Sequence, residues 1–288
     1  MKYAYYPGCS LHATAVDYDE STLAVAGALG VELVEVPDWS CCGSTPAHST
    51  DELLAAALPA KNLLAARTVA EEAVVCCSAC FSRFKFAQKH IEEKEHLRAQ
   101  LAEMMPIEDI RGMKVRHLID VLVKDVGLEK VAEAKKRDLD LKVACYYGCL
   151  LTRPPKVTEF DDAEDPQSMD ELLTAAGMET VPWPFKTECC GATFSLTRTE
   201  IVLRLTAEIL EMAKQAGADC ISVACPLCHA NLDMRQSDIA KKIGIDYGMP
   251  IFYFTQLLGM AFGLAPDDLG IGRGLVDCKE LLAAKGVE

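Results

Sequence analysis

Residues 41–43 read CCG, and the same three letters return 148 positions later at residues 189–191. The same offset relates CSAC at residues 77–80 to CPLC at residues 225–228. Chance does not place matching cysteines twice at one common spacing, so the two segments indicate an internal repeat. We therefore interpret the chain as a tandem duplication.

An earlier motif extends the repeat toward the start of each copy. Residues 5–9 read YYPGC and residues 146–149 read YYGC, and the second copy has eight extra residues between this motif and CCG. The repeated unit is about 140 residues long, which is the size of a single domain. We predict two cysteine-rich domains, at residues 1–137 and 138–288.

Composition narrows the class of protein. Of the 288 residues 50% are hydrophobic, which is enough for two cores, and the net charge of −14 argues against nucleic acid as a partner. The longest apolar stretch, residues 251–264, is too short for a membrane span, and no leader peptide is recognisable. We expect a cytoplasmic protein, in which 14 cysteines indicate metal or redox chemistry rather than disulfides.

Each half alternates strand-like and helix-like segments. In the first half we expect strands at 3–6, 32–36, 73–76 and 114–118, and helices at 20–29, 51–70, from about 80, and 119–126. In the second half we expect strands at 142–147, 180–182, 220–224 and 251–254, and helices at 169–176 and 199–215 and after residue 254. This order predicts an α/β fold of two βαβ-type halves, each with a largely parallel sheet, related by a pseudo-twofold axis.

The repeated cysteines follow the predicted strands. Strand ends of a parallel sheet share one edge, where ligands bind, so the cysteines of each half should converge there. The CxxC pairs stand at predicted helix starts, where the helix dipole favours thiolate. A glycine stands next to the cysteines in four places, namely Gly8, Gly43, Gly148 and Gly191. Glycine allows the tight turns that bring backbone and sulfur close to an inorganic core. The sequence predicts two equivalent sites, which could face each other.

Five thiols in each half are one more than tetrahedral zinc or a cubane iron–sulfur cluster needs. Adjacent cysteines cannot easily chelate one tetrahedral metal, because their side chains diverge, but they can bind different metals of a polynuclear cluster. We favour a cluster, with zinc or an ordinary iron–sulfur cluster in one or both halves as the alternative. Four cysteines lack a repeat partner and are expected to be small core residues: Cys76, Cys145, Cys220 and Cys278.

The motif order is a first cysteine, CCG, 33 residues and then CxxC, and it resembles the duplicated cysteine-rich CCG domain. The YYPGC opening resembles the B subunit of heterodisulfide reductase in particular. The resemblance implies one noncubane four-iron, four-sulfur cluster in each half. It implies that the first cluster is held by Cys9, Cys41, Cys42, Cys77 and Cys80. It implies that the second is held by Cys149, Cys189, Cys190, Cys225 and Cys228.

The chemistry of that family is the reductive cleavage of a disulfide, which takes two electrons. Two clusters could deliver one electron each to a disulfide held between them, while the protein supplies binding and orientation. The resemblance implies two partner subunits, one ferredoxin-like (the C type) and one flavin-containing (the A type), since this sequence shows no dinucleotide or flavin motif. The alternative is a non-catalytic electron-transfer or scaffold subunit.

Other polar residues are weaker candidates. His12 and His229 could donate a hydrogen bond to a cluster sulfur or a proton to a departing thiolate, or could simply bond to the backbone. Arg83 and Arg198 could attract a substrate anion, although most surface arginines have no such role. The acidic run at residues 159–165 is expected to be a solvated loop, with a partner contact as the alternative.

Overall fold

The computed structural model describes residues 1–110 and 112–286, which form two four-stranded parallel sheets. The first sheet has the order β2-β1-β3-β4, with β1 at Lys2–Tyr6, β2 at Glu32–Glu35, β3 at Glu72–Val75 and β4 at Lys114–His117. The second has the order β6-β5-β7-β8, with β5 at Lys142–Tyr146, β6 at Glu179–Thr180, β7 at Cys220–Val223 and β8 at Ile251–Tyr253. Because both sheets repeat one strand order, the predicted duplicated α/β fold is confirmed.

The helices of the first half are α1 (Gly8–Leu11), α2 (Val16–Ala28), α3 (Ser44–Thr50), α4 (Glu52–Arg67), α5 (Ser78–Glu93), α6 (Glu95–Met104), α7 (Leu118–Val121) and α8 (Leu128–Ala134). Helix α4 begins where predicted, since the Asp51 side chain accepts a hydrogen bond from the Leu54 amide at 2.7 Å. The short helix α1 and the helices α3, α6 and α8 were not predicted. Helix α7 continues as a π-helical turn at Leu122–Val126, so the helix predicted at 119–126 is present, with its second part π-helical.

The helices of the second half are α9 (Cys149–Thr152), α10 (Pro155–Thr158), α11 (Ser168–Ala175), α12 (Thr199–Gln215), α13 (Pro226–Met234), α14 (Gln236–Ile243), α15 (Phe254–Ala261) and α16 (Lys279–Ala284). The bounds of α12 match the prediction, because its apolar positions recur at helical spacing. No helix of residues 1–110 and 112–286 is long and apolar enough to cross a membrane.

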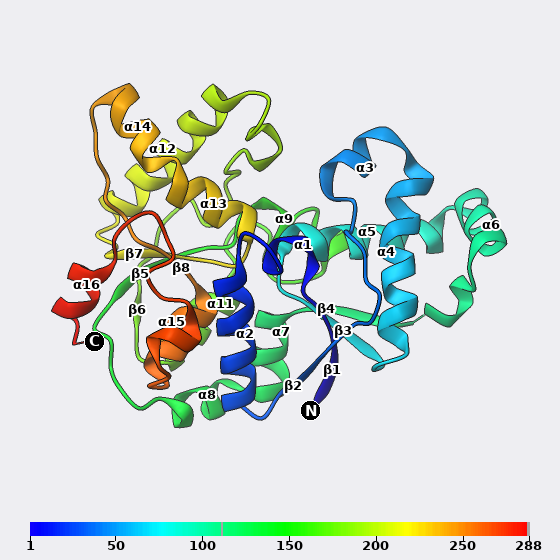
Figure 1. The fold of residues 1–288 in the computed structure, drawn as a ribbon, viewed down its shortest axis with the longest axis horizontal. Coiled ribbons are helices and arrows are strands. Elements are labelled where there is room, and N and C mark those ends of the chain that lie inside the picture. Colours follow the sequence, from blue (N-terminus) through cyan, green and yellow to red (C-terminus); the bar gives the residue numbers. More distant parts are fainter. Residues whose placement is uncertain (111, 287–288) are drawn as a thin grey trace.

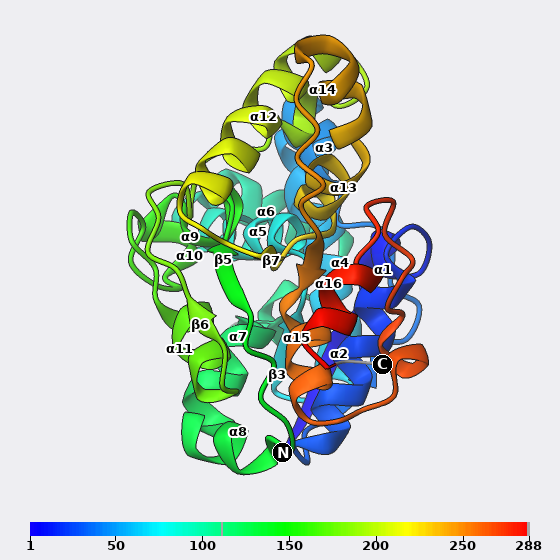
Figure 2. The same ribbon diagram turned by 90° about the vertical axis from the view of Figure 1, so that its left-hand side faces the viewer.

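The two halves pack tightly against each other. Helix α2 of the first half lies beside α15 of the second, as two views show (Figures 1 and 2). Between the halves the Ser21 and Thr255 hydroxyls are 2.7 Å apart, and the rings of Tyr18 and Tyr253 stack at 4.1 Å. One hydrophobic core therefore runs through both sheets. The predicted domain boundary at residue 137 falls between α8 and β5 and stays a prediction.

The four cysteines without a repeat partner lie in this core. Cys76, Cys145 and Cys220 are fully buried, and Cys278 is almost so. Burial raises the pKa of Cys76 to about 12, so this thiol stays protonated. They behave as the small core residues that we expected.

Candidate metal centre

The first set of cysteines comes from three turns at the carboxyl edge of the first sheet. Cys9 lies in α1 after β1, Cys41 and Cys42 lie in the loop after β2, and Cys77 follows β3 and caps α5, which carries Cys80 in its first turn. The Sγ atoms of Cys9 and Cys41 are 3.9 Å apart, and those of Cys42 and Cys80 are 3.2 Å apart. The structure thus gathers all five from distant parts of the chain.

The second set repeats this arrangement on the second sheet. Cys149 opens α9, and Cys225 caps α13, which carries Cys228. The Sγ atoms of Cys190 and Cys228 are 3.5 Å apart, and Cys189 Sγ accepts a hydrogen bond from the Gly191 amide at 3.3 Å. The same residue types therefore surround both sets.

The two sets meet where the CxxC motifs begin. Cys77 and Cys225 lie close enough across the boundary between the halves for each thiol to shift the pKa of the other. Beside them, the Ser78 hydroxyl donates a hydrogen bond to the Ala224 carbonyl at 3.0 Å. The equivalent sites that the repeat predicts therefore adjoin each other.

Glycines permit the close approach of backbone to sulfur. Gly8, Gly43, Gly148 and Gly191 all have φ between +68° and +84°, in the left-handed region that favours glycine. A Cβ atom at Gly148 would lie 3.1 Å from Cys228 Sγ, and one at Gly8 would lie 3.4 Å from Cys80 Sγ. The predicted need for glycine in these turns is confirmed.

A tyrosine holds each paired-cysteine loop, and sequence reasoning missed it. The Tyr6 hydroxyl donates to the Ser40 carbonyl at 2.8 Å, and the Tyr146 hydroxyl donates to the Glu188 carbonyl at 2.6 Å. Both carbonyls directly precede a Cys-Cys pair. Burial raises the pKa of both tyrosines, which keeps the donor proton in place. Counting back two residues from each Gly-Cys would have found this pair, with Tyr147 standing where the first half has proline.

The pKa values of the thiols differ within each set. Interactions with the neighbouring thiols of Cys41 and Cys80 lower the pKa of Cys42 to about 4. In the second set, hydrogen bonds from Cys228 and Cys77 lower the pKa of Cys225. Each set therefore holds a cysteine ready to serve as thiolate, which is the form that binds metal.

Neither histidine candidate faces the thiols through a hydrogen bond. The His12 ring lies 3.4 Å from Glu35 and packs edge-on against Trp39. The His229 ring stacks on Tyr253 at 4.4 Å, and its Nε2 lies 3.2 Å from the Ile251 carbonyl. The contact of His229 with a backbone carbonyl fits the alternative that we gave for it.

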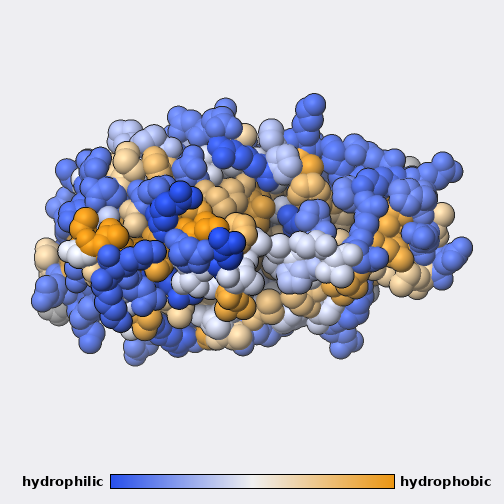
Figure 3. All heavy atoms as spheres, turned by 90° about the horizontal axis from the view of Figure 1, so that it is seen from above, coloured by the Kyte–Doolittle hydropathy of each residue, from blue (hydrophilic) through white to orange (hydrophobic). Residues whose placement is uncertain are grey.

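A cavity of about 240 Å³ opens beside the second set. Its lining combines cysteines of the second half with residues of the first half. The cysteines are Cys149, Cys189, Cys190, Cys225 and Cys228. The first-half residues are Thr45, His48, Ser78, Ala79 and Arg83. The hydroxyls of Thr45 and Thr193, which occupy equivalent repeat positions, are 3.4 Å apart across it. Figure 3 shows this face of the molecule from above, with hydrophobic side chains exposed among hydrophilic ones.

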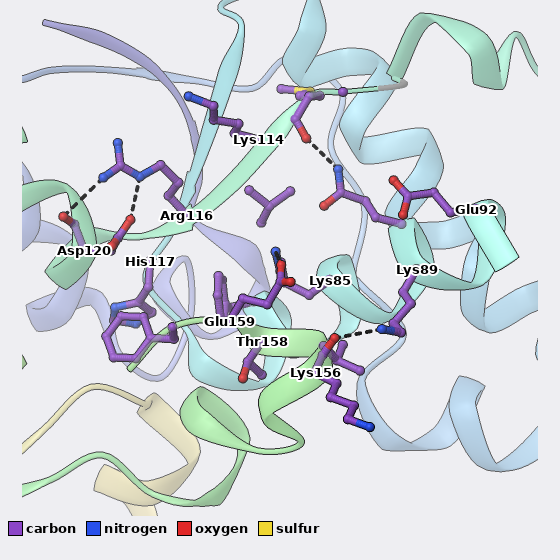
Figure 4. A pocket seen from close by; sticks show the side chains of 17 residues that line it. Lys85, Lys89, Glu92, Lys114, Arg116, His117, Asp120, Lys156, Thr158 and Glu159 are labelled. Atoms are coloured by element: carbon purple, nitrogen blue, oxygen red, sulfur yellow. Dashed lines mark hydrogen bonds and ion pairs between the residues drawn. The ribbon is translucent and has the colours of Figure 1, made fainter. Parts of the chain in front are cut away.

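A second cavity, of about 390 Å³, lies between α5, β4 and α10, away from the ten cysteines (Figure 4). Most of its cations form ion pairs, among them Lys85 with Glu159 at 3.3 Å and Arg116 with Asp120 at 2.6 Å. Glu159 starts the acidic run of residues 159–165, so part of that exposed loop is tied to the first half. Paired charges leave this cavity little capacity to attract an ion, and we place no chemistry in it.

The donor set suits an iron–sulfur cluster. Thiolates are the usual ligands of such clusters, and each half offers five at the edge of its sheet. Among residues 1–110 and 112–286, no three Cys, His, Asp or Glu side chains meet closely enough to hold a single metal ion. The geometry therefore shows no preformed single-ion site in the described chain.

Comparison with known proteins gives the same picture. The model of the cysteine-rich domain called CCG matches residues 3–85 and 143–233. The B subunit of ferredoxin:CoB-CoM heterodisulfide reductase from Methanosarcina mazei is 31% identical over 98% of this chain and 96% of its own length. The 8-methylmenaquinol:fumarate reductase membrane anchor subunit of Wolinella succinogenes is 30% identical over 97% and 99%.

Among solved structures, a hypothetical protein from Helicobacter pylori superposes with a TM-score of 0.74 at 13% identity. The match covers 96% of this chain and 52% of that one, and at this identity it supports the fold alone. Two CCG domains and near-complete alignment at 31% identity show the family: this chain belongs to the duplicated cysteine-rich CCG proteins, of the type that forms the B subunit of heterodisulfide reductase.

Proposed function

We propose that this chain is the component of a heterodisulfide reductase-like complex at which a disulfide is cleaved or formed. The two cysteine sets would each hold a noncubane four-iron, four-sulfur cluster, with the ten cysteines as ligands. The observation that carries the proposal is the hydrogen bond from the Ser78 hydroxyl to the Ala224 carbonyl at 3.0 Å, directly beside Cys77 and Cys225, which makes the two five-thiol sets neighbours. Two neighbouring one-electron centres suit a reaction that consumes two electrons.

The overall reaction adds two electrons and two protons to one disulfide and releases two thiols. Bound clusters would supply the electrons, one at a time. The chain would bind and orient the disulfide in the cavity beside Cys149 and Cys189, and the Tyr6 and Tyr146 hydrogen bonds would hold the paired-cysteine loops still. Cys9, Cys41 and Cys189 are exposed, so water can exchange protons near the reacting sulfurs.

The partners belong to the same proposal. Two further subunits, one ferredoxin-like and one flavin-containing, would deliver electrons from outside the chain. The name of the Methanosarcina relative places ferredoxin in its reaction, which supports an iron–sulfur electron donor. The cytoplasmic location expected from the sequence stays a prediction.

One observation favours a second function. The Wolinella relative is named as the membrane anchor subunit of a fumarate reductase. A chain of this type could therefore transfer electrons or anchor a complex without acting on a disulfide. The two functions differ in one property, since only the first requires disulfide binding between the cysteine sets.

Metal analysis tests the proposal. We expect an anaerobic preparation to contain about four irons and four acid-labile sulfides per half. Cys190→Ser should remove the second cluster and Cys42→Ser the first, so each variant should keep about half of the iron. Near-zero iron with bound zinc would refute the proposal, and a fully loaded protein that neither binds nor reduces disulfides would favour the electron-transfer function.

A further inference from the structure

Arg83 places a positive charge beside the first set of cysteines. It lies one turn after Cys80 on α5, and residues three apart on a helix are neighbours on its surface. Its guanidinium carbon stands 5.0 Å from the centre of the Phe86 ring, and it donates a hydrogen bond to the Ser82 hydroxyl at 3.4 Å. The thiols of Cys42 and Cys80 act on its charge, and no Asp or Glu of the described residues forms an ion pair with it. The charge of this half-buried arginine is therefore not compensated by a carboxylate.

The same side chain also lies near the second set. Arg83 lines the cavity beside that set, together with cysteines such as Cys149 and Cys228. Among the described residues that line this cavity, Arg83 is the only Lys or Arg, and none is an Asp or Glu. His48 lines it too, but burial and the charge of Arg83 lower the pKa of His48, so its ring is neutral at pH 7. A guanidinium stays protonated in proteins, so one positive charge adjoins both sets.

The second half carries no equivalent charge. Adding 148 to position 83 gives Asn231, a neutral residue whose amide donates to the Cys190 carbonyl at 3.0 Å. The residue before the paired cysteines differs as well, since it is Ser40 in the first half and the exposed Glu188 in the second. The CxxC motifs begin a helix in both halves, so the helix dipoles do not distinguish the two sets. Both charge differences make the surroundings of the first set more positive than those of the second.

We propose that Arg83 separates the redox potentials of the two centres, by raising the potential of the first-half cluster above that of the second. Reduction makes a cluster more negative, so a nearby positive charge stabilises the reduced form, and net charge is one of the properties that set cluster potentials. The iron–sulfur donor proposed above would therefore reduce the first cluster before the second. Each step moves one electron from the donor to one cluster. The inference rests on the proposed function, because it requires a cluster in each half.

A redox titration of the anaerobically reconstituted protein tests the inference, followed by absorption and electron paramagnetic resonance spectroscopy. Cys190→Ser and Cys42→Ser assign the signals, because each should keep only one cluster. We expect the first cluster of the wild type to have the higher potential. Arg83→Gln should change the one-electron reduction equilibrium of the first cluster about tenfold, which lowers its potential by about 59 mV, and should move the second less. Arg83→Lys keeps the charge and should keep most of the wild-type potential.

Arg204→Gln is the matched control, because it removes the same charge from an exposed position on α12, in a surface hollow that no cysteine of the described residues lines. It should leave both potentials unchanged. If Arg83 acted only through packing, Arg83→Lys would change the first potential as much as Arg83→Gln does, and the inference would be overturned. Equal shifts of both clusters in Arg83→Gln overturn it too. A wild-type protein whose second cluster has an equal or higher potential overturns it even if no Arg83 variant folds.

The failure of this inference and the failure of the proposed function give different results. Full iron content and disulfide turnover with potentials that ignore Arg83 would overturn the inference alone. Potentials that respond to Arg83 as expected, in a protein that neither binds nor reduces disulfides, would support the inference and favour the electron-transfer function. A protein that holds zinc in place of iron would overturn both, because zinc has no redox potential to adjust.

Discussion

Gly148→Ala should damage the second metal centre more than it damages the fold. Gly148 has φ +68°, and an added Cβ atom would lie 3.1 Å from Cys228 Sγ. Gly127 offers a matched control: its φ +87° and ψ 144° are close to the φ +68° and ψ 178° of Gly148, and nothing lies within 4 Å of an added Cβ atom. Both substitutions strain the backbone in a similar way, and only one of them pushes a proposed ligand.

The magnitudes separate the two effects. A non-glycine residue that combines positive φ with extended ψ costs on the order of 1–3 kcal/mol, which both variants should show as a similar fall in melting temperature of several degrees. At Gly148 the sulfur must also move by a few tenths of an ångström to reach an ordinary contact distance. Metal–thiolate distances tolerate only about 0.2 Å, so the displacement is large enough to weaken metal binding.

Iron and acid-labile sulfide per chain are the readout, with thermal unfolding measured on the same samples. We expect Gly127→Ala to keep its full iron content and Gly148→Ala to lose up to half of it, since the first set is untouched. Equal iron in the two variants would refute the reasoning, because it would mean that Cys228 Sγ has room to move or does not bind metal.

Two further predictions concern the contact between the halves. The buried His117 ring is neutral: its Nδ1 accepts from the Ile119 amide at 3.3 Å, its Nε2 lies 2.7 Å from the Cys76 carbonyl, and burial lowers its pKa to about 4. As the pH falls, the unfolded chain takes up this proton at a higher pH than the folded chain does. The contribution of neutral His117 to the free energy of unfolding is therefore fully present above about pH 6.5, and this free energy should fall by roughly 3 kcal/mol as the pH drops to 4. An NMR titration that gives His117 a pKa above 6 in the folded protein would contradict this. Ser21→Ala leaves the buried Thr255 hydroxyl without its hydrogen-bond partner, so it should lower the free energy of unfolding, measured in urea, by about 1–3 kcal/mol. The double variant Ser21→Ala with Thr255→Val removes both hydroxyls and should recover part of that loss.

The sheets and the gathering of the cysteines could be predicted because they follow from local pattern and one topological rule. Strand-like runs alternated with helix-like ones, and parallel strands share their carboxyl edge, so residues as distant as Cys9 and Cys41 had to meet. Helix α6 could not be predicted in this way. It is short and polar, and it is held by the packing of Leu97 and Leu101 on Ala56 of another helix.

The side-chain contacts between the two halves could not be predicted from the sequence pattern. The stacking of Tyr18 on Tyr253 joins residues far apart in the chain, and no periodicity of either segment encodes that pairing. The same is true of the cavity. Its lining joins Arg83 and His48 of the first half to cysteines of the second, and only the packing of the two halves decides that.

The two halves anchor their paired-cysteine loops differently, and this explains how one of them could acquire Arg83. In the second half Asn231, on the CxxC helix, holds the Cys190 carbonyl. In the first half Asn62, on α4, holds both the amide and the carbonyl of Ser40 at 2.8 Å, just before Cys41. An anchor on α4 leaves position 83 of the CxxC helix without that task. The two cysteine sets can therefore stay alike under duplication while the side chains around them diverge.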